Sequence, residues 1–334
     1  MDTKENITDK GNPVKKGICV LGLGVIGTTY AYVLQEKGIE VKHLIRESKR
    51  ATTPSTLDVK LLDGRYKNKG EEKMGTYKVT QAVPGSSYDF ILISVASGKL
   101  EGAIETLRTN DISGTLVLFC NLWNDRKYIE AVVGEYPYVM AFPTAGGHLE
   151  DGKLDCVLFD HIMLESKSKS GIDNYDDLIA YLSKADIKTE NPYDMVEWIW
   201  IHMAVNAGVT STAARDGKID NPRQLALNLM SDHKALAKAV KTIRETLKVV
   251  EGRGVDLKLY KDEINVYKIP ACIAGIAMKH LFASNELTRR IMTLHNDVAD
   301  IMYGCDCVYN EGKRQDIDLP MFYGNMDRIK AELG

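Results

Sequence analysis

The segment Gly22-Leu23-Gly24-Val25-Ile26-Gly27 constrains the fold of this chain more than any other feature. It directly follows an apolar run, Gly17–Leu21, which predicts a buried strand, and it opens a helical pattern over Thr28–Glu36. A second apolar run, Val41–Ile45, predicts the next strand. A strand, a glycine-rich turn, a helix and a second strand in this order predict the first unit of a Rossmann fold.

Each glycine of the segment has a distinct physical role in such a unit. Gly22 permits a tight turn, Gly24 lets a pyrophosphate approach the backbone, and Gly27 lets the helix pack closely on the strand. The free N–H groups at the start of the helix, around Val25 and Ile26, and the positive end of the helix dipole favour bound phosphate. We therefore expect a dinucleotide-binding site at this turn.

The first half of the chain continues to alternate strands and helices. This alternation predicts right-handed βαβ units and a parallel sheet covered on both faces, so the expected fold class is α/β. Between Val59 and Val79 the runs are shorter and rich in lysine, and we expect an edge strand or an excursion there. The other expected elements are strands at Phe90–Val95, Leu116–Cys120 and Val139–Phe142 and helices at Glu101–Leu107 and Arg126–Val133.

The pattern changes after Phe142. The pairs Gly146–Gly147 and Asp151–Gly152 punctuate two runs, Cys156–Phe159 and Ile162–Glu165, that we interpret as the strands of a hairpin. From there on helical periodicity dominates, in Met195–Ala214, Leu225–Gly252, a stretch from Ile269 and Leu287–Met302. We expect a disordered arm at residues 1–13, a Rossmann domain at 14–191 and an all-helical substrate and dimerisation domain at 192–334, with the substrate between the two domains.

The end of the second strand selects the nucleotide. A site for NAD normally has an acidic residue here to hold the ribose hydroxyls, whereas this chain has Arg46 followed by Glu47. An arginine can bind a 2′-phosphate through charge-assisted, bidentate hydrogen bonds. We expect NADP as the cofactor, and Glu47 leaves NAD open.

Composition excludes several other classes of protein. The chain of 334 residues has 43 basic and 46 acidic residues, a net charge of -3, which argues against a nucleic-acid partner. No apolar run reaches transmembrane length, so we expect no membrane partner. The six cysteines are scattered as in a protein of the reducing cytoplasm. Cys305 and Cys307 with His295 have the wrong spacing for a zinc site, and we expect no metal.

Three stretches resemble the ketopantoate reductase family. They are Gly38–Arg46, Trp200–Thr210 and the end of a later helix at Val249–Leu257, and they follow one another in the family's order. The resemblance implies an NADPH-binding Rossmann domain joined to a helical domain. It also implies reduction of a small 2-keto acid to a 2-hydroxy acid, and a homodimer with which the apolar late helices are compatible.

The resemblance also implies site residues, with departures from the family pattern. Where the family has lysine, asparagine and asparagine at intervals of four, this chain has His202, Asn206 and Thr210, which a helix places on one face. We therefore assign catalysis to His202 and Asn206 and substrate binding to Thr210. The nearest register for the family's glutamate gives His295, Asn296 or Asp297. Of these we assign Asn296 to substrate and Asp297 to catalysis, while Ser284 matches a serine that binds the substrate and Asn121 an asparagine beside the nicotinamide.

A histidine in place of the lysine changes the expected chemistry. As an imidazolium, His202 could polarise a ketone and donate a proton, with a nearby carboxylate, Asp297, raising its pKa. A His–Asp pair of this kind favours an alternative, an opine-type or other hydroxy-acid dehydrogenase. A second alternative is an NADP-binding sensor that has lost catalysis. The remaining histidines, including His43, belong to no constellation that the sequence defines.

Overall fold

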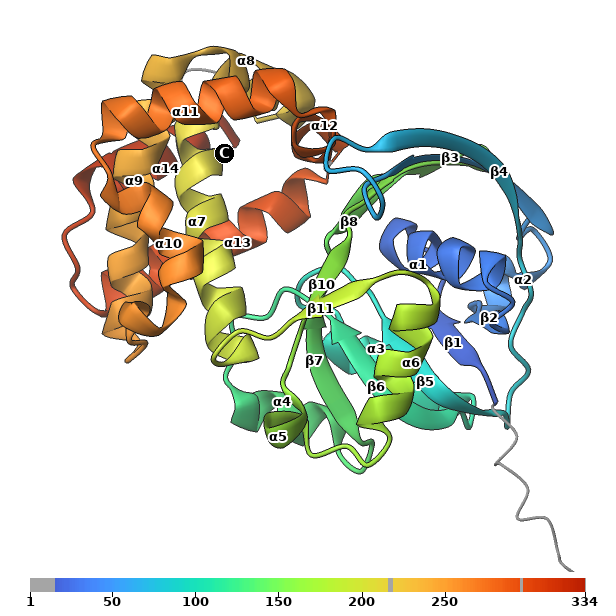
Figure 1. Cartoon of the computed structure of the whole chain (residues 1–334). Coiled ribbons are helices and arrows are strands. Elements are labelled where there is room, and N and C mark those ends of the chain that lie inside the picture. Colours follow the sequence, from blue (N-terminus) through green and yellow to red (C-terminus); the bar gives the residue numbers. More distant parts are fainter. Residues whose placement is uncertain (1–15, 216–218, 295–296, 334) are drawn as a thin grey trace, which may run out of the picture.

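The computed structural model describes residues 16–215, 219–294 and 297–333. An α/β domain with a parallel sheet is followed by a helical region, and this confirms the expected fold class (Figure 1). The arm expected at residues 1–13 lies outside the described residues. The last strand ends at Glu190 and the first long helix begins at Met195. We propose to divide the chain into two domains between them, after residue 191.

The central sheet has seven strands in the order β11-β10-β7-β6-β5-β1-β2. The strands β1, β2, β5, β6 and β7 are mutually parallel, while β10 is antiparallel to β7 and parallel to β11. The chain leaves β2 at one edge and returns to β5 on the other side of β1, which makes a topological switch point at the carboxyl end of β1. The strands are β1 (Ile18–Leu21), β2 (Val41–Leu44), β5 (Ser87–Ile93), β6 (Ser113–Phe119), β7 (Tyr138–Phe142), β10 (His161–Leu164) and β11 (Lys188–Glu190).

Helices cover both faces of this sheet. Successive strand residues alternate between the faces, so that in β6 Leu116 and Leu118 pack on one side and Val117 and Phe119 on the other. The first side holds α3 (Leu100–Thr109) and α4 (Arg126–Val133), and the second holds α1 (Val25–Glu36) and α6 (Tyr175–Lys184). Two short helices, α2 (Glu47–Arg50) and α5 (Lys167–Ser170), complete the domain.

A second sheet, which the sequence did not predict, lies over α1 (Figure 1). Its order is β4-β3-β9-β8, and its strands are β3 (Thr56–Asp63), β4 (Glu71–Lys78), β8 (Ala145–Glu150) and β9 (Lys153–Leu158). The expected hairpin between Cys156–Phe159 and Ile162–Glu165 is wrong, because β9 pairs with β8 and β3 while β10 joins the central sheet. The tight turn is Asp151–Gly152, where both φ angles are positive (48° and 75°), as a two-residue hairpin requires.

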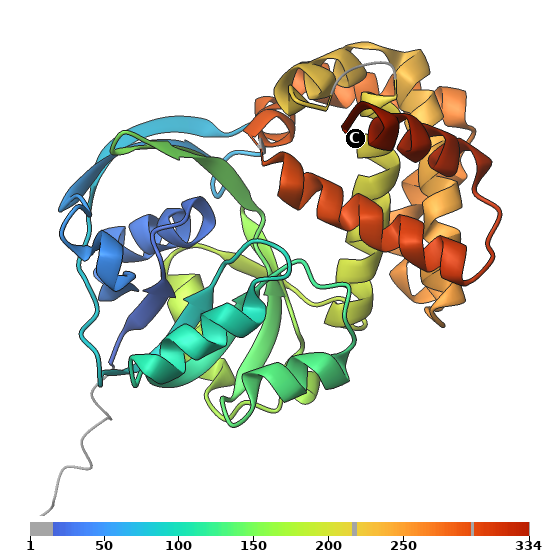
Figure 2. The same ribbon diagram turned by 180° about the vertical axis from the view of Figure 1, so that it is seen from behind.

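The helical region is built around α7 (Met195–Ala214), which packs against α9, α13 and α14 (Figure 2). Its other elements are α8 (Pro222–Ser231), α9 (His233–Gly252), the short 3-10 helix η1 (Leu257–Tyr260), α10 (Lys261–Lys268), α11 (Ala271–Ser284), α12 (Glu286–Leu294), α13 (Val298–Arg314) and α14 (Pro320–Leu333).

Two helices that the sequence predicts as continuous are broken. Leu225–Gly252 is divided at Asp232, whose carboxylate accepts a hydrogen bond from the N–H of Lys234 and caps α9. Leu287–Met302 is divided before Asp297, which caps α13. In both places an aspartate side chain satisfies N–H groups that a helix start leaves free, so ending one helix and starting another costs little.

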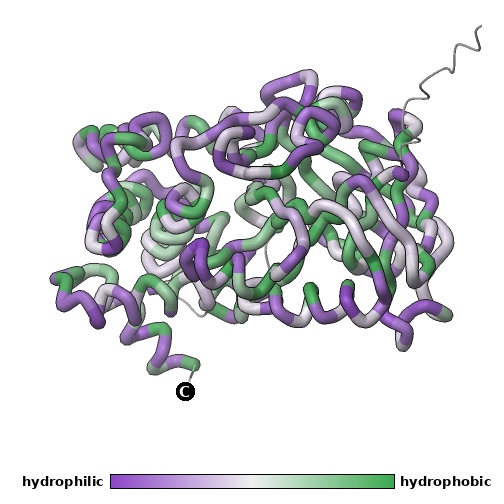
Figure 3. Tube along the Cα trace, turned by 90° about the horizontal axis from the view of Figure 1, so that it is seen from below, coloured by the Kyte–Doolittle hydropathy of each residue, from purple (hydrophilic) through white to green (hydrophobic). Residues whose placement is uncertain are grey.

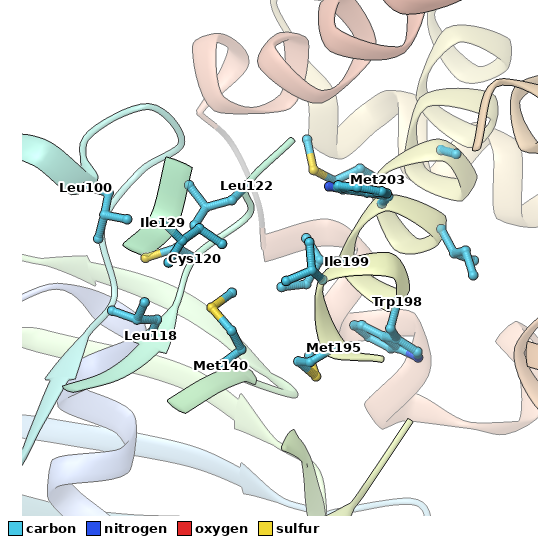
Figure 4. Close-up of a cluster of buried hydrophobic side chains, with 14 of the residues drawn as sticks. Leu100, Leu118, Cys120, Leu122, Ile129, Met140, Met195, Trp198, Ile199 and Met203 are labelled. Carbon is cyan, nitrogen blue, oxygen red and sulfur yellow. The ribbon is translucent and has the colours of Figure 1, made fainter. Parts of the chain in front are cut away.

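The two regions share one hydrophobic core. Met195, Ile199 and Met203 of α7 belong to the same buried cluster as Leu118 and Met140 of the sheet (Figure 4). Figure 3 shows hydrophobic stretches inside the molecule and hydrophilic ones along its outside. Among the described residues no single helix is long and apolar enough to cross a membrane, although the bent pair Leu257–Lys268 and Ala271–Ser284 meets that criterion by length and composition together.

Candidate active site

The glycine turn lies at the carboxyl end of β1, at the switch point of the sheet. Gly22 has a φ of +78°, and its N–H donates to the carbonyl of Leu44 at 2.9 Å. A Cβ on Gly27 would lie 2.5 Å from Cγ1 of Val20, so only glycine lets α1 pack this closely on β1. Both positions have the geometry that the sequence predicts for them.

Gly24 borders open space in front of the first turn of α1. It is the N-cap residue of the helix, is exposed, and a Cβ placed on it would meet only the carbonyl oxygen of Ser94, at 3.8 Å. The first N–H groups of α1, at Val25 and Ile26, have no acceptor within the helix because it starts there. Free N–H groups at the positive end of a helix dipole, with room before them, form a cradle that suits phosphate.

Arg46 lies where the sequence predicts the residue that reads the nucleotide. It is the N-cap residue of α2, directly beyond β2, and its side chain is exposed with no ion pair or hydrogen bond to a described residue. Glu47, which left NAD open, lies 3.2 Å from Nε of Arg50. The unpaired guanidinium is thus available to a ligand, while the neighbouring carboxylate has a basic partner.

Asn121 follows β6 on the same edge of the sheet. Its side-chain oxygen Oδ1 is buried and has no hydrogen-bond partner among the described residues. A buried acceptor without a partner costs about 1–3 kcal/mol, so an N–H donor supplied by a ligand would remove this penalty.

His202 lies on α7 and faces the carboxyl end of β7. Its ring stacks on Trp198, with centroids 5.3 Å apart and an interplanar angle of 11°, and lies 4.4 Å from the ring centroid of Phe142. The amide Nδ2 of Asn206 is 2.9 Å from Nε2 of His202. Burial against the aromatic rings lowers the pKa of His202 from 6.5 to about 4, so the imidazole is neutral near pH 7.

The expected pair between His202 and Asp297 is not formed. The contacts of the His202 ring within the described residues are two aromatic side chains and an amide, with no carboxylate among them. Oδ1 of Asp297 accepts hydrogen bonds from the N–H groups of Ala299 and Asp300 at 3.0 and 3.2 Å. Because the carboxylate caps α13, it does not raise the pKa of His202.

The other assigned side chains are only partly brought together. Thr210 lies two turns beyond His202 on α7 and is half-buried, whereas Asn206 between them is exposed. Ser284 ends α11, and its exposed hydroxyl donates back to the carbonyls of His280 and Leu281. Asn296 lies outside the described residues, as does His295.

Asp300 is a residue that sequence reasoning missed. Its Oδ1 accepts a hydrogen bond from the N–H of Ser97, 2.9 Å away, in the loop between β5 and α3. It also raises the pKa of the buried thiol of Cys120, next to Asn121, after the larger effect of burial. The carboxylate therefore reaches the carboxyl edge of the sheet from α13. The sequence signal was the capping residue Asp297, which places Asp300 in the first turn of a new helix.

No group of three side chains suited to hold a metal occurs among the described residues. Cys305 is buried, which raises the pKa of its thiol to about 12, and Cys307 is half-buried.

The model of the ketopantoate reductase family PanE/ApbA matches residues 18–154 of this chain. The match runs from β1 to β9 and includes the glycine turn, Arg46 and Asn121. Residues 18–154 therefore have the sequence pattern of the ketopantoate reductase family. The resemblance seen in the sequence is thereby confirmed over these residues. A comparison with curated protein sequences gives no match.

Solved structures share the fold over both domains. Dimeric ketopantoate reductase from Staphylococcus aureus is 13% identical with a TM-score of 0.61, covering 94% of this chain and 97% of its own. D-Mandelate dehydrogenase with NADH and anilino(oxo)acetate is 13% identical with a TM-score of 0.63 and the same coverage. 2-Dehydropantoate 2-reductase from Methylococcus capsulatus is 16% identical with a TM-score of 0.59, covering 94% and 96%.

Replacing Gly24 with valine tests the phosphate cradle. The backbone accepts a side chain, since the added Cβ meets nothing closer than 3.8 Å, but the isopropyl group would fill the space before α1. We expect Gly24→Val to abolish dinucleotide binding, measured by calorimetric titration, with little change in the melting temperature. Gly102→Val, at an exposed position of α3 with no atom within 4 Å, is the matched control and should bind as the wild type does. Wild-type affinity in Gly24→Val would place the phosphates elsewhere.

Proposed function

We propose that the protein is an NADP-dependent oxidoreductase that transfers a hydride between the nicotinamide and a small 2-keto or 2-hydroxy acid. The observation that carries the proposal is the open cradle at Gly24, on the same sheet edge as the ring of His202. The match of residues 18–154 to the ketopantoate reductase family model supports the reaction class. The fold shared with a D-mandelate dehydrogenase bound to NADH supports a nicotinamide cofactor and a hydroxy-acid substrate.

The residues present fit a dinucleotide. The N–H groups of Val25 and Ile26, with Gly24 and Gly27 leaving room, would hold the pyrophosphate, and Arg46 would hold a 2′-phosphate. The buried oxygen of Asn121 would accept a hydrogen bond from the nicotinamide carboxamide. The cofactor supplies or accepts the hydride when bound, and all other steps fall to the side chains.

His202 would exchange a proton with the substrate oxygen. In hydroxy-acid oxidation the neutral imidazole accepts the proton of the hydroxyl group, and in reduction the protonated ring returns it. In the resting ring Nε2 accepts a hydrogen bond from the amide Nδ2 of Asn206, so Nδ1 carries the hydrogen, and the substrate hydroxyl would displace this amide to deliver its proton to Nε2. Because the pKa of His202 is about 4, the ring is neutral in the resting enzyme and can accept a proton. It does so without the carboxylate partner, Asp297, that the sequence suggested. Thr210 on the same face would contact the substrate.

The alternatives differ in substrate or in catalysis. An opine-type dehydrogenase would need an amine as second substrate, so a panel of keto acids with and without amines, followed at the nicotinamide absorbance, separates the two. A sensor without catalysis would bind the nucleotide and turn over nothing. The bond between His202 and Asn206 supports an enzyme, because it orients a proton acceptor that a sensor does not need.

Replacing Arg46 tests the choice of nucleotide. The lost charge-assisted contact to the 2′-phosphate should cost about 1.5–3 kcal/mol, so Arg46→Ala should bind NADPH at least about tenfold more weakly and NADH nearly unchanged. Lys49→Ala, an exposed basic residue in the same short helix, is the control. Equal losses for both nucleotides, or a wild type that prefers NADH, would contradict the assignment.

Replacing His202 tests the proton exchange. His202→Ala should lower kcat about 100-fold or more with the affinity for NADPH unchanged. Since the pKa of His202 is about 4, the wild-type kcat/KM for oxidation should be flat above about pH 5, and that for reduction should fall about tenfold per pH unit there. His280→Ala, at an exposed histidine of α11, is the control. An unchanged kcat in His202→Ala would remove His202 from the mechanism.

We propose that the enzyme works in the cytoplasm and as a homodimer. All six cysteines are free, which supports a reducing compartment. An exposed apolar row along α10, α11 and the link between them is available for self-association. Ala274 and Gly275 on the inner side of α11 are buried. The exposed residues of the row are Val266, Ile269, Ile273, Ile276 and Leu281. The dimeric reductase of the same fold supports a dimer.

Charged substitutions in this apolar row test whether it forms the dimer interface. Light scattering behind size exclusion should give a dimer for the wild type and a monomer for the double variant Ile273→Glu, Ile276→Glu, because two buried, unpaired carboxylates cannot be accommodated in an apolar interface. Met74→Glu, at an exposed apolar residue of β4, should remain dimeric. A monomeric wild type at micromolar concentration would rule out the dimer.

A further inference from the structure

His43 is a buried polar side chain that the proposed reaction does not use. It lies in β2, paired with Val20 of β1, and is fully buried. Its Nδ1 is 2.7 Å from the carbonyl oxygen of Gly22, in the glycine turn, and its Nε2 is 2.7 Å from the hydroxyl of Tyr77 in β4. Tyr77 is also fully buried. The ring therefore joins the phosphate cradle to the second sheet.

The partners determine the tautomer of His43. The Gly22 carbonyl can only accept, so Nδ1 must carry the hydrogen and donate it. Burial lowers the pKa of His43 to about 4, so the ring carries one hydrogen near pH 7 and Nε2 is a bare acceptor. The hydroxyl of Tyr77 then donates to Nε2. Every polar atom of the chain Tyr77–His43–Gly22 is satisfied in one arrangement only.

This arrangement orients one peptide group of the cradle. The carbonyl of Gly22 and the N–H of Leu23 belong to the same trans peptide and point in opposite directions. Since His43 holds the carbonyl toward the interior, the N–H of Leu23 is directed outward, and it has no acceptor among the described residues. Glycine at position 22, with its φ of +78°, would otherwise allow this peptide to turn over. A turned peptide would present a carbonyl oxygen to an incoming phosphate.

We propose that His43 is a positioning residue for the pyrophosphate of the dinucleotide. Its ring locks the Gly22–Leu23 peptide with the N–H of Leu23 directed outward, and Tyr77 fixes the tautomer that His43 needs. This inference rests on the proposed nucleotide-binding function. It gives the second sheet a part in cofactor binding, because Tyr77 comes from β4 and bonds to the ring of His43.

Two amide substitutions separate positioning from packing. The amide nitrogen of asparagine can take the place of Nδ1 as the donor to Gly22, whereas the amide of glutamine takes the place of Nε2, where its oxygen can accept from the hydroxyl of Tyr77. His43→Asn should therefore keep NADPH affinity within about threefold, and His43→Gln should bind about tenfold more weakly, the effect of one buried hydrogen bond. Tyr77→Phe should lie between them. Adenosine 2′-monophosphate, which lacks the pyrophosphate, should bind all variants as it binds the wild type.

Melting temperatures provide the readout that packing alone would not produce. His43→Asn leaves the fully buried hydroxyl of Tyr77 without its partner, whereas in His43→Gln the freed carbonyl of Gly22, which is only half-buried, can turn toward solvent. His43→Asn should therefore be the less stable of the two amide variants, although it binds NADPH more tightly. A purely structural role gives the opposite order, with affinity following stability, and would overturn the proposal. Equal NADPH affinity in His43→Gln and the wild type, or a parallel loss of adenosine 2′-monophosphate, would overturn it as well. A wild type that binds no dinucleotide would instead refute the proposed function, and this inference with it.

Discussion

The geometry of the whole molecule depends on the burial of the first half of α7 in the core of the α/β domain. Met195 and Ile199 are fully buried in the cluster that also contains residues of β6 and β7. Truncating one such side chain costs about 2–5 kcal/mol, so this contact has the strength of a domain core and exceeds that of an ordinary contact between mobile domains. The helix that carries His202 is therefore held in a fixed position over the carboxyl edge of the sheet. The shared core does the positioning on which a proton transfer depends.

The same burial explains the chemistry available to His202. The aromatic rings of Trp198 and Phe142 that hold the imidazole in place also remove water from it, and an imidazolium loses more by this than a neutral ring does. The family's lysine would be charged throughout the neutral pH range. In the proposed mechanism, histidine at this position would replace a permanent charge by a group that is neutral at rest and would take up a proton from the substrate.

Local signals in the sequence predicted the glycine turn, the parallel strands and the long helix α7, because each is encoded within a single run of residues. The second sheet could not be predicted in this way, since β3 pairs with β9 from a distant part of the chain, and the alternation of polar and apolar residues in β3 indicates a strand but not its partner. The assignment of Asp297 to catalysis follows from the nearest register of the family's glutamate, in a pattern from Leu287 to Met302 that reads as one helix. Periodicity continues across a break when a capping aspartate starts the next helix in a similar register, so the capping role was hidden.

The second sheet also joins the two domains at a point far from α7. Leu287 of α12 is buried against Leu62 and Val157, and Arg290 forms ion pairs with Glu72 at 2.9 Å and with Asp155. A helical domain attached at two separated places can turn only about the line that joins them, unlike one attached by a single linker. The sheet that supports His43 through Tyr77 is thus also the sheet on which α12 rests. The α12 contact and the glycine turn are thus connected in space by the strands of the second sheet, Tyr77 and the ring of His43.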